Sequence, residues 1–368
     1  MKRFAIWSGG FLVLLATAAF IFGRPIAWVQ AGLIIWDIAA GGKPTWWQDV
    51  TRAPSQAIAR WDGGEGDLYQ PTPTAEARTA LVLVPGAAVM GRDEPRLQAL
   101  ARTLARAGLV VLVPELPEVR RLALSRRDAD RVASALREMR RREPRLPLGV
   151  AAVSYAVAPA IIAALETSPD FVVGIGGYRD SESAIRFITT GVFRPAGDAR
   201  QFQVEPNRYA RWAFVLANAG RLESPHDAHL LQEIARRRFY DPDADIGRLS
   251  GELGPQGRAV LALIENRDPD AVGPLIQALP AKVREEISGL DLALYELPKL
   301  RGDLILVHGR GDRMVPFSES QDLAAAASNA HVSLFLIDDT GHVEFDAVSL
   351  ANGYTMWRAV LKVLSQRR

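Results

Sequence analysis

Length, composition and charge set the first limits on this protein. The chain has 368 residues, of which 48% are hydrophobic and 23% charged, which suffices for one large α/β domain with an insertion or for two ordinary domains. The formal net charge of +2 is too small to indicate a nucleic-acid partner, and a sequence without cysteine excludes disulfides, a thiol nucleophile and thiolate metal sites.

The N-terminal segment predicts a membrane anchor. Lys2 and Arg3 precede an uncharged apolar stretch over residues 4–23, and about 20 apolar residues span the hydrocarbon core of a bilayer. A signal peptide cleaved after residues 16–18 and a segment that packs on a globular domain are the alternatives. The two basic residues favour a cytoplasmic N-terminus with the main domain on the outer, periplasmic side; cleavage would release it as a secreted or periplasmic protein.

A second apolar stretch follows over residues 25–40. It contains Gln30 and Asp37 and is short for a span, so we expect it to lie in the membrane interface. Six of the eight tryptophans fall in the first 61 residues, and tryptophan concentrates at membrane–water interfaces. Packing of these rings on a globular domain is the alternative. We predict an anchor and interfacial segment over residues 1–45.

Beyond residue 45, apolar strands and amphipathic helices alternate. Four short β-rich runs are separated by helical patterns, and they cover residues 79–86, 109–116, 148–154 and 171–178. Near-continuous apolar strands with intervening helices predict a mostly parallel sheet that is covered by helices on both faces.

The alternation stops at residue 179 and resumes near residue 301. We predict a hydrolase-like core in two parts, residues 46–178 and 301–368, with a helical cap inserted over residues 179–300. Such a cap would lie above the carboxyl ends of the strands, where parallel sheets bind ligands.

Three polar residues follow predicted strands and form a candidate catalytic triad. Ser154 ends the run "LGVAAVS", Asp312 follows "LILVHGRGD", and His342 follows "LFLIDDTGH". A serine hydroxyl becomes nucleophilic when an imidazole removes its proton, and a buried carboxylate fixes the tautomer of that imidazole. Backbone N–H groups must then stabilise the oxyanion; we expect them from Tyr155 and from Ala87 in the loop "VPGAAVMG".

With these motifs the sequence resembles the α/β-hydrolase superfamily, nearest to its dienelactone-hydrolase-like and lysophospholipase-like branches. The resemblance covers roughly residues 65–178 and 296–366 and is most specific in "GRGDRMVP". It implies the α/β-hydrolase fold, no cofactor and no metal. It also implies Ser154 as nucleophile, His342 as base and Asp312 as acid, with Ala87 and Tyr155 as oxyanion donors.

The turn around the serine departs from the family pattern. The family's G-x-S-x-G has become Ala152-Val-Ser154-Tyr-Ala156, and alanine would be strained if either position required a positive φ. Pro159 also lies near the start of the following helix, where it removes a backbone donor and can kink the helix.

The remaining polar residues are not placed in the candidate triad. Asp180 is an alternative acid, and His308 is expected to shape the site rather than to react. His226 and His229 are spaced for one helix face, and we interpret them as solvated rather than as metal ligands. Glu344 and Asp346 are expected to face water.

These observations predict a membrane-anchored serine hydrolase that cleaves an ester, with a thioester or amide as further possibilities. The apolar cap residues Trp212, Phe214, Val215 and Leu216 favour an apolar acyl group. Two alternatives stay open: a degenerate hydrolase that acts as a membrane-tethered binding or scaffold protein, and an acyltransferase with the same triad.

Overall fold

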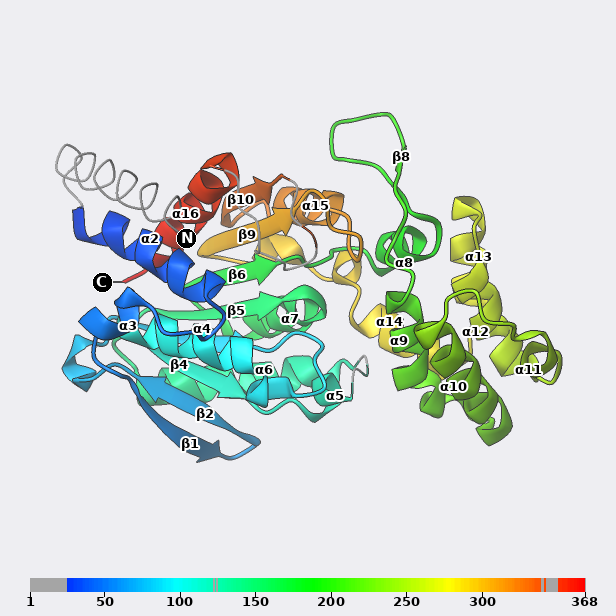
Figure 1. Ribbon diagram of the computed structural model, residues 1–368, viewed down its shortest axis with the longest axis horizontal. Helices are drawn as coiled ribbons and strands as arrows, with labels where there is room; N and C mark the ends of the chain where they lie inside the picture. The colour runs from blue at the N-terminus through cyan, green and yellow to red at the C-terminus, as the bar shows by residue number, and fades with distance from the viewer. Residues whose placement is uncertain (1–24, 122, 124, 339–340, 342–349, 368) are drawn as a thin grey trace.

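A central eight-stranded sheet organises the molecule (Figure 1). The computed structural model describes residues 25–121, 123, 125–338, 341 and 350–367. The strand order is β1-β2-β4-β3-β5-β6-β9-β10. β2 is antiparallel to both of its neighbours, and every pairing from β4 to β10 is parallel. The strands are β1 (Ser55–Trp61), β2 (Gly64–Gln70), β3 (Thr79–Val84), β4 (Leu109–Pro114), β5 (Leu148–Val153), β6 (Phe171–Ile175), β9 (Asp303–Gly309) and β10 (His331–Ile337).

Helices cover both faces of this sheet. Every residue of β3 and β4 is buried, as expected for strands covered on both sides. Alternate residues of β3 enter different cores: Val82 packs with α6 and α7, whereas Leu81 packs with α2 and α4. One face carries α6 (Arg127–Arg142), α7 (Val157–Thr167) and α15 (Ser318–Ala326); the other carries α2 (Pro25–Ala39), α3 (Trp46–Val50), α4 (Pro95–Arg106) and α16 (Leu350–Leu364).

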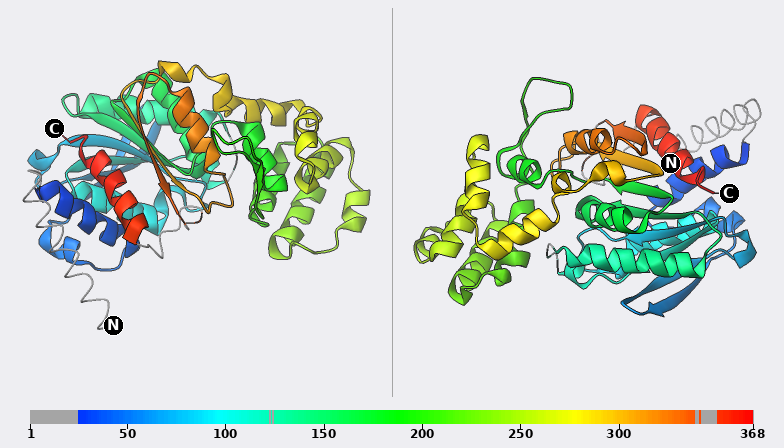
Figure 2. Two further views of the ribbon diagram at one scale, coloured as in Figure 1. Left: turned by 90° about the horizontal axis from the view of Figure 1, so that it is seen from above. Right: turned by 180° about the vertical axis from the view of Figure 1, so that it is seen from behind.

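A helical block interrupts the sheet between β6 and β9. Figures 1 and 2 show that the block lies beyond the carboxyl ends of β5 and β6, where the arrows of these strands point. It has apolar clusters of its own, one of them centred on Trp212, Leu231 and Ile234. The block, called the cap below, consists of α8 (Ser181–Thr190), β7 (Val192–Phe193), β8 (Phe202–Gln203), α9 (Ala210–Asn218), α10 (Pro225–Tyr240), α11 (Gly247–Gly251), α12 (Pro255–Glu265), α13 (Val272–Gln277) and α14 (Ala281–Gly289).

Short helical segments join these elements. They are α5 (Pro117–Arg120) and the 3₁₀ turns η1 (Thr74–Glu76), η2 (Gly91–Asp93), η3 (Ser154–Ala156), η4 (Ala219–Arg221), η5 (Pro269–Ala271), η6 (Leu292–Leu294) and η7 (Leu297–Lys299). Together the sheet, its two helical layers and the cap before β9 confirm the predicted α/β-hydrolase fold class.

The segment predicted for the membrane interface forms α2, which packs on the core. Ala31 and Ile34 are fully buried, and the Trp28 ring meets Trp357 of α16 edge-on with centroids 4.6 Å apart. Asp37 is buried too: its carboxylate accepts hydrogen bonds from the Thr45 and Thr103 hydroxyls. Trp28, which is partly buried, and Trp47, which is buried, therefore pack on the core, as the alternative to a membrane interface predicted.

The predicted anchor over residues 4–23 lies outside the described residues. Within the described part of the chain, none of the helices combines the length and apolar character needed to cross a membrane. Trp36 and Trp46, by contrast with Trp28 and Trp47, are about half exposed, at 51% and 50%.

Candidate active site

The turn between β5 and α7 holds Ser154 in an unusual backbone conformation. Ser154 has φ +56°, in the left-handed region that residues other than glycine rarely adopt. Among the described residues other than glycine, only Ser168, at the end of α7, shares a positive φ. A strand that leads into a helix through such a turn is the geometry of a nucleophile elbow, which presents the serine hydroxyl at the carboxyl edge of the sheet. The side chain of Ser154 is half-buried.

The flanking alanines do not oppose this turn. Ala152 lies within β5, paired with Val84 and Gly174, and Ala156 has φ −68°. Neither position requires the left-handed conformation, so a side chain adds no backbone strain at either one. Pro159 is the third residue of α7, where the backbone N–H lacks a partner within the helix in any case. The condition under which alanine would strain the turn is therefore not met, and Pro159 removes no hydrogen bond from within α7.

Glycines outside the elbow let the chain approach it closely. A Cβ atom at Gly177, after β6, would lie 2.5 Å from Cβ of Val157, the first residue of α7. A Cβ atom at Gly86, after β3, would lie 3.3 Å from the carbonyl oxygen of Val153. The turns after β3 and β6 thus flank Ser154 on both sides, without glycine next to the serine itself.

The loop after β9 holds the candidate acid. Asp312 is 4% exposed, and its Oδ1 accepts hydrogen bonds from the backbone N–H groups of Met314 (2.7 Å) and Val315 (3.0 Å). Its Oδ2 lies 3.4 Å from Nε2 of His308, a buried ring that also contacts the Val315 carbonyl oxygen at 3.0 Å. These contacts hold the carboxylate in one orientation. His308 therefore acts on the acid loop, as expected for a residue that shapes the site.

The candidate base, His342, lies outside the described residues, as do Glu344 and Asp346. Strand β10, which precedes His342 in the sequence, pairs in parallel with β9, which precedes Asp312. Ser154 follows β5, which is separated from β9 only by β6. The sheet order thus gathers the ends of β5, β9 and β10 at one edge, and the three-residue triad stays a prediction.

The two candidate oxyanion donors lie in the segments that follow β3 and β5. Ala87 is exposed and follows Gly86, where a Cβ atom would lie 3.3 Å from the Val153 carbonyl oxygen. Tyr155 follows Ser154 directly and is 5% exposed. Their assignment as oxyanion donors remains a prediction.

The Tyr155 side chain anchors the elbow to α6. Its hydroxyl accepts a hydrogen bond from the Ser125 N–H (2.9 Å) and donates one to Oδ2 of Asp128 (3.0 Å). Asp128 is fully buried, and burial raises the pKa of its carboxyl group to about 7. Sequence reasoning missed Asp128, because it reads as an ordinary acidic residue in the first turn of a helix.

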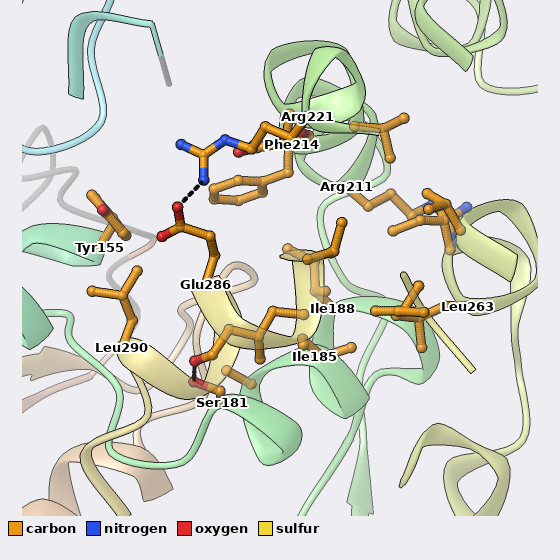
Figure 3. Close-up of a pocket in the computed structure, with 18 of the residues that line it drawn as sticks. Tyr155, Ser181, Ile185, Ile188, Arg211, Phe214, Arg221, Leu263, Glu286 and Leu290 are labelled. Atoms are coloured by element: carbon orange, nitrogen blue, oxygen red, sulfur yellow. Dashed lines mark hydrogen bonds and ion pairs between the residues drawn. The ribbon is translucent and has the colours of Figure 1, made fainter. Parts of the chain in front are cut away.

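A cavity of about 230 Å³ adjoins Ser154 and extends into the cap (Figure 3). Ser154, Tyr155 and the acid-loop residues Met314 and Val315 line it on the core side. The cap contributes mostly apolar side chains, from α8, α9, α12 and α14, among them Ile185, Ile188, Phe214, Val215, Leu263 and Ile287. Of the four apolar cap residues singled out in the sequence, Phe214 and Val215 line this cavity, whereas Trp212 and Leu216 pack within the cap.

Three charged residues also line the cavity. Arg221 forms an ion pair with Glu286, with Nη1 and Oε1 3.0 Å apart, and Figure 3 marks this contact. Arg211, on α9, has no such partner in the described part of the chain. None of these residues was predicted. The only sequence signal was an arginine within the otherwise apolar segment "RWAFVLA".

The remaining polar candidates have structural roles. Asp180, the alternative acid, accepts a hydrogen bond from the Ser183 N–H and so caps the N-terminus of α8. His226 and His229 are exposed on α10, as expected. Over the ranges that the structure describes, no group of three or more potential ligands could hold a metal ion.

No model of a protein family and no curated protein sequence matches the chain. Among solved structures, it is similar to an acylaminoacyl peptidase from Pyrococcus horikoshii at 11% identity and a TM-score of 0.48, over 86% of this chain and 41% of that one. It is similar to a dienelactone hydrolase from Anabaena variabilis at 13% identity and a TM-score of 0.46, over 86% and 99% of the two chains. A thermostable carboxylesterase cloned from a metagenomic library gives 12% identity and a TM-score of 0.48, over 94% and 96%.

The chain thus matches 41% of the length of the peptidase. At identities this low, the chemistry has to be argued from the residues themselves.

Proposed function

We propose that this protein is a serine hydrolase that cleaves a carboxylic ester with an apolar acyl group. The observation that carries the proposal is the left-handed backbone of Ser154, at a strand-to-helix turn that opens on an apolar cavity. A non-glycine residue held at positive φ costs free energy, and such strain persists chiefly where function depends on it. The burial of Asp312 on the neighbouring loop supports the same assignment.

The proposed reaction proceeds through an acyl-enzyme. Oγ of Ser154 attacks the ester carbonyl carbon while His342 accepts the hydroxyl proton. The resulting oxyanion is stabilised by the backbone N–H groups of Ala87 and Tyr155. The C–O bond to the alcohol then breaks, and His342 returns the proton to the leaving oxygen. Water, activated by the same imidazole, hydrolyses the acyl-enzyme and regenerates Ser154.

Asp312 positions the base in this scheme. Its Oδ1 is already occupied by two backbone N–H groups, so the carboxylate cannot rotate freely. A carboxylate fixed in this way holds the imidazole in one tautomer and stabilises the imidazolium that forms during attack. No cofactor takes part in these steps.

Ester hydrolysis with matched serine variants tests the proposal. The expected result is turnover of p-nitrophenyl octanoate by the wild-type protein, reduced at least about 10³-fold in Ser154→Ala. Ser168→Ala is the matched control, because Ser168 is the other serine with a positive φ but follows α7. Turnover that survives in Ser154→Ala would contradict the assignment of the nucleophile.

Two outcomes would favour the alternatives. Wild-type protein that binds the ester without turnover would indicate the degenerate, scaffold-like protein. Transfer of the octanoyl group to an added alcohol in preference to water would indicate an acyltransferase. Thioester and amide analogues of the same acyl group establish which bond is cleaved.

We further propose that residues 4–23 anchor the protein to a membrane, with the hydrolase core on the outer side. The support is the uncharged apolar sequence of this segment after Lys2 and Arg3. The neighbouring helices α2 and α3 expose Ile26, Trp36, Trp46 and Val50, each at least 50% accessible, which suits contact with lipid headgroups. Intact mass of the membrane-extracted protein would show residues 1–23 retained; cleavage after residue 18 would contradict the anchor.

A further inference from the structure

Arg211 places a buried positive charge in the wall of an apolar cavity. The residue lies in the first turn of α9 and is 8% exposed. Its Nε atom is shielded from solvent without an acceptor, and among the described residues none forms a hydrogen bond or ion pair with the guanidinium. The Trp212 ring lies 5.7 Å from it, which supports one face of the cation but satisfies none of its N–H groups.

The neighbouring arginines differ from Arg211 in this respect. Arg208 pairs with Asp243 at 2.6 Å, and Arg238 lies 3.6 Å from Glu265. Arg267 donates to the Thr189 carbonyl oxygen at 3.0 Å. Across the cavity, Arg221 is paired with Glu286. Arg211 is therefore the arginine of this region that is left without an acceptor in the described part of the chain.

A buried guanidinium without an ion-pair partner is costly, and the Nε–H group of Arg211 has lost water without gaining an acceptor. Burial lowers the pKa of Arg211 to about 10, so the group still carries its charge at neutral pH. The protein tolerates this charge at a position that lines the cavity beside Ser154. An anion that enters the cavity would supply the missing acceptors.

The shape of the cavity indicates where this anion belongs. Figure 3 shows Tyr155 on one side of the cavity and Arg211 on the opposite side. The side chains between them, such as Phe214 and Ile188, are apolar. A ligand that reaches both ends therefore needs a reactive carbonyl, an apolar middle and a terminal anion.

We propose that Arg211 binds the terminal carboxylate of an ω-carboxyacyl chain, so that the preferred substrates are monoesters of medium-chain dicarboxylic acids. A single planar guanidinium matches a carboxylate, which carries one charge and two in-plane oxygens. A phosphate dianion would call for additional donors, and the other arginine that lines the cavity is already paired with Glu286. The substrate class rests on the hydrolase function proposed above; the anion site rests on Arg211 alone.

Matched substrate pairs test this inference. Mono-p-nitrophenyl esters of C6, C8, C10 and C12 dicarboxylic acids are compared with the p-nitrophenyl esters of the monocarboxylic acids of equal length. The measured quantity is the ratio of kcat/KM for the charged and uncharged member of each pair. This ratio cancels any general loss of active protein in a variant.

The expected result is a ratio above one in the wild-type protein at one or more chain lengths. In Arg211→Met that ratio falls on the order of 10- to 100-fold, the range expected when a charge-assisted hydrogen bond is lost. Arg208→Met is the matched control, because Arg208 precedes α9 and is already paired, and it should leave the ratio unchanged. A ratio that is the same in wild type and Arg211→Met at every length would overturn the inference.

A binding measurement separates this inference from the proposed function. Calorimetry compares decanoate with decanol on the wild-type protein and on Arg211→Met, and it requires no turnover. Decanoate binding that is lost in Arg211→Met would support the anion site even if no ester were hydrolysed. Ester hydrolysis without Arg211-dependent binding or discrimination would leave the hydrolase in place and contradict the anion site.

Discussion

Val157, the first residue of α7, packs directly on the backbone of Gly177 beyond the end of β6. A Cβ atom at Gly177 would lie 2.5 Å from Cβ of Val157, closer than two such atoms can approach. A second glycine, Gly174 within β6, faces the same side chain, with its hypothetical Cβ 3.1 Å from Cγ1 of Val157. The close approach of helix and sheet behind Ser154 thus depends on glycines of the neighbouring strand and its turn.

Replacing Gly177 with alanine should push α7 away from the sheet. We expect Gly177→Ala to lower the free energy of unfolding by about 1–3 kcal/mol, as overpacking of a buried contact does, and to reduce ester turnover. Urea denaturation and p-nitrophenyl octanoate hydrolysis measure the two effects. Adding Val157→Ala should recover only part of the lost stability, because it removes Cγ1 and Cγ2, which the new methyl group meets at 2.5 and 2.8 Å, but keeps the Cβ atom at 2.5 Å. Gly251→Ala is the control, since a Cβ there meets nothing within 4 Å.

Restoring the family's glycine beside the serine should bring no benefit. Ala156 has φ −68° and is fully buried, so Ala156→Gly removes a packed methyl group and relieves no strain. We expect a loss of about 0.5–1 kcal/mol in stability and no increase in kcat. A variant that gained activity would mean that the alanine strains the elbow after all.

Asp128 should make stability depend on pH. The folded protein retains the Asp128 proton up to a pH of about 7, whereas the unfolded chain releases it near the usual aspartate pKa of about 4. The free energy of unfolding should therefore fall as pH rises from about 4 to 7, with a contribution approaching about 1.4 kcal/mol per pH unit, and this contribution should level off above pH 7.

Asp128→Asn tests this dependence, because an amide keeps an acceptor for the Tyr155 hydroxyl but does not titrate. Urea denaturation at pH 5, 6, 7 and 8 should show a flatter profile than that of the wild-type protein. Asp130→Asn, which removes an exposed carboxylate two residues away on the same helix, should leave the profile nearly parallel to wild type. An unchanged profile in Asp128→Asn would contradict the raised pKa.

Much of the fold could be read from the sequence because local patterns determine it. The strands that precede Ser154 and Asp312 are continuous apolar runs, and a parallel sheet gathers their carboxyl ends at one edge. The helical cap was also recognisable, because the alternation of strands and helices stops at β6 and resumes at β9.

The features that escaped prediction depend on contacts between distant segments. Whether alanine is tolerated at 152 and 156 depends on backbone angles, and the space behind Ser154 comes from Gly177. Trp212 and Phe214 are two residues apart in one apolar run, yet one packs inside the cap and the other lines the cavity. Arg211 stood out in the sequence only as an arginine within an apolar run, and its burial depends on how α9 packs.

The central claim is that Ser154 is the nucleophile, and covalent labelling tests it most directly. A fluorophosphonate probe reacts with a serine that its surroundings have activated, and peptide mass mapping then locates the adduct. We predict one adduct on Ser154 in the wild-type protein and in Ser168→Ala, and none in Ser154→Ala. Wild-type protein that takes no label, or label that persists in Ser154→Ala, would contradict the account.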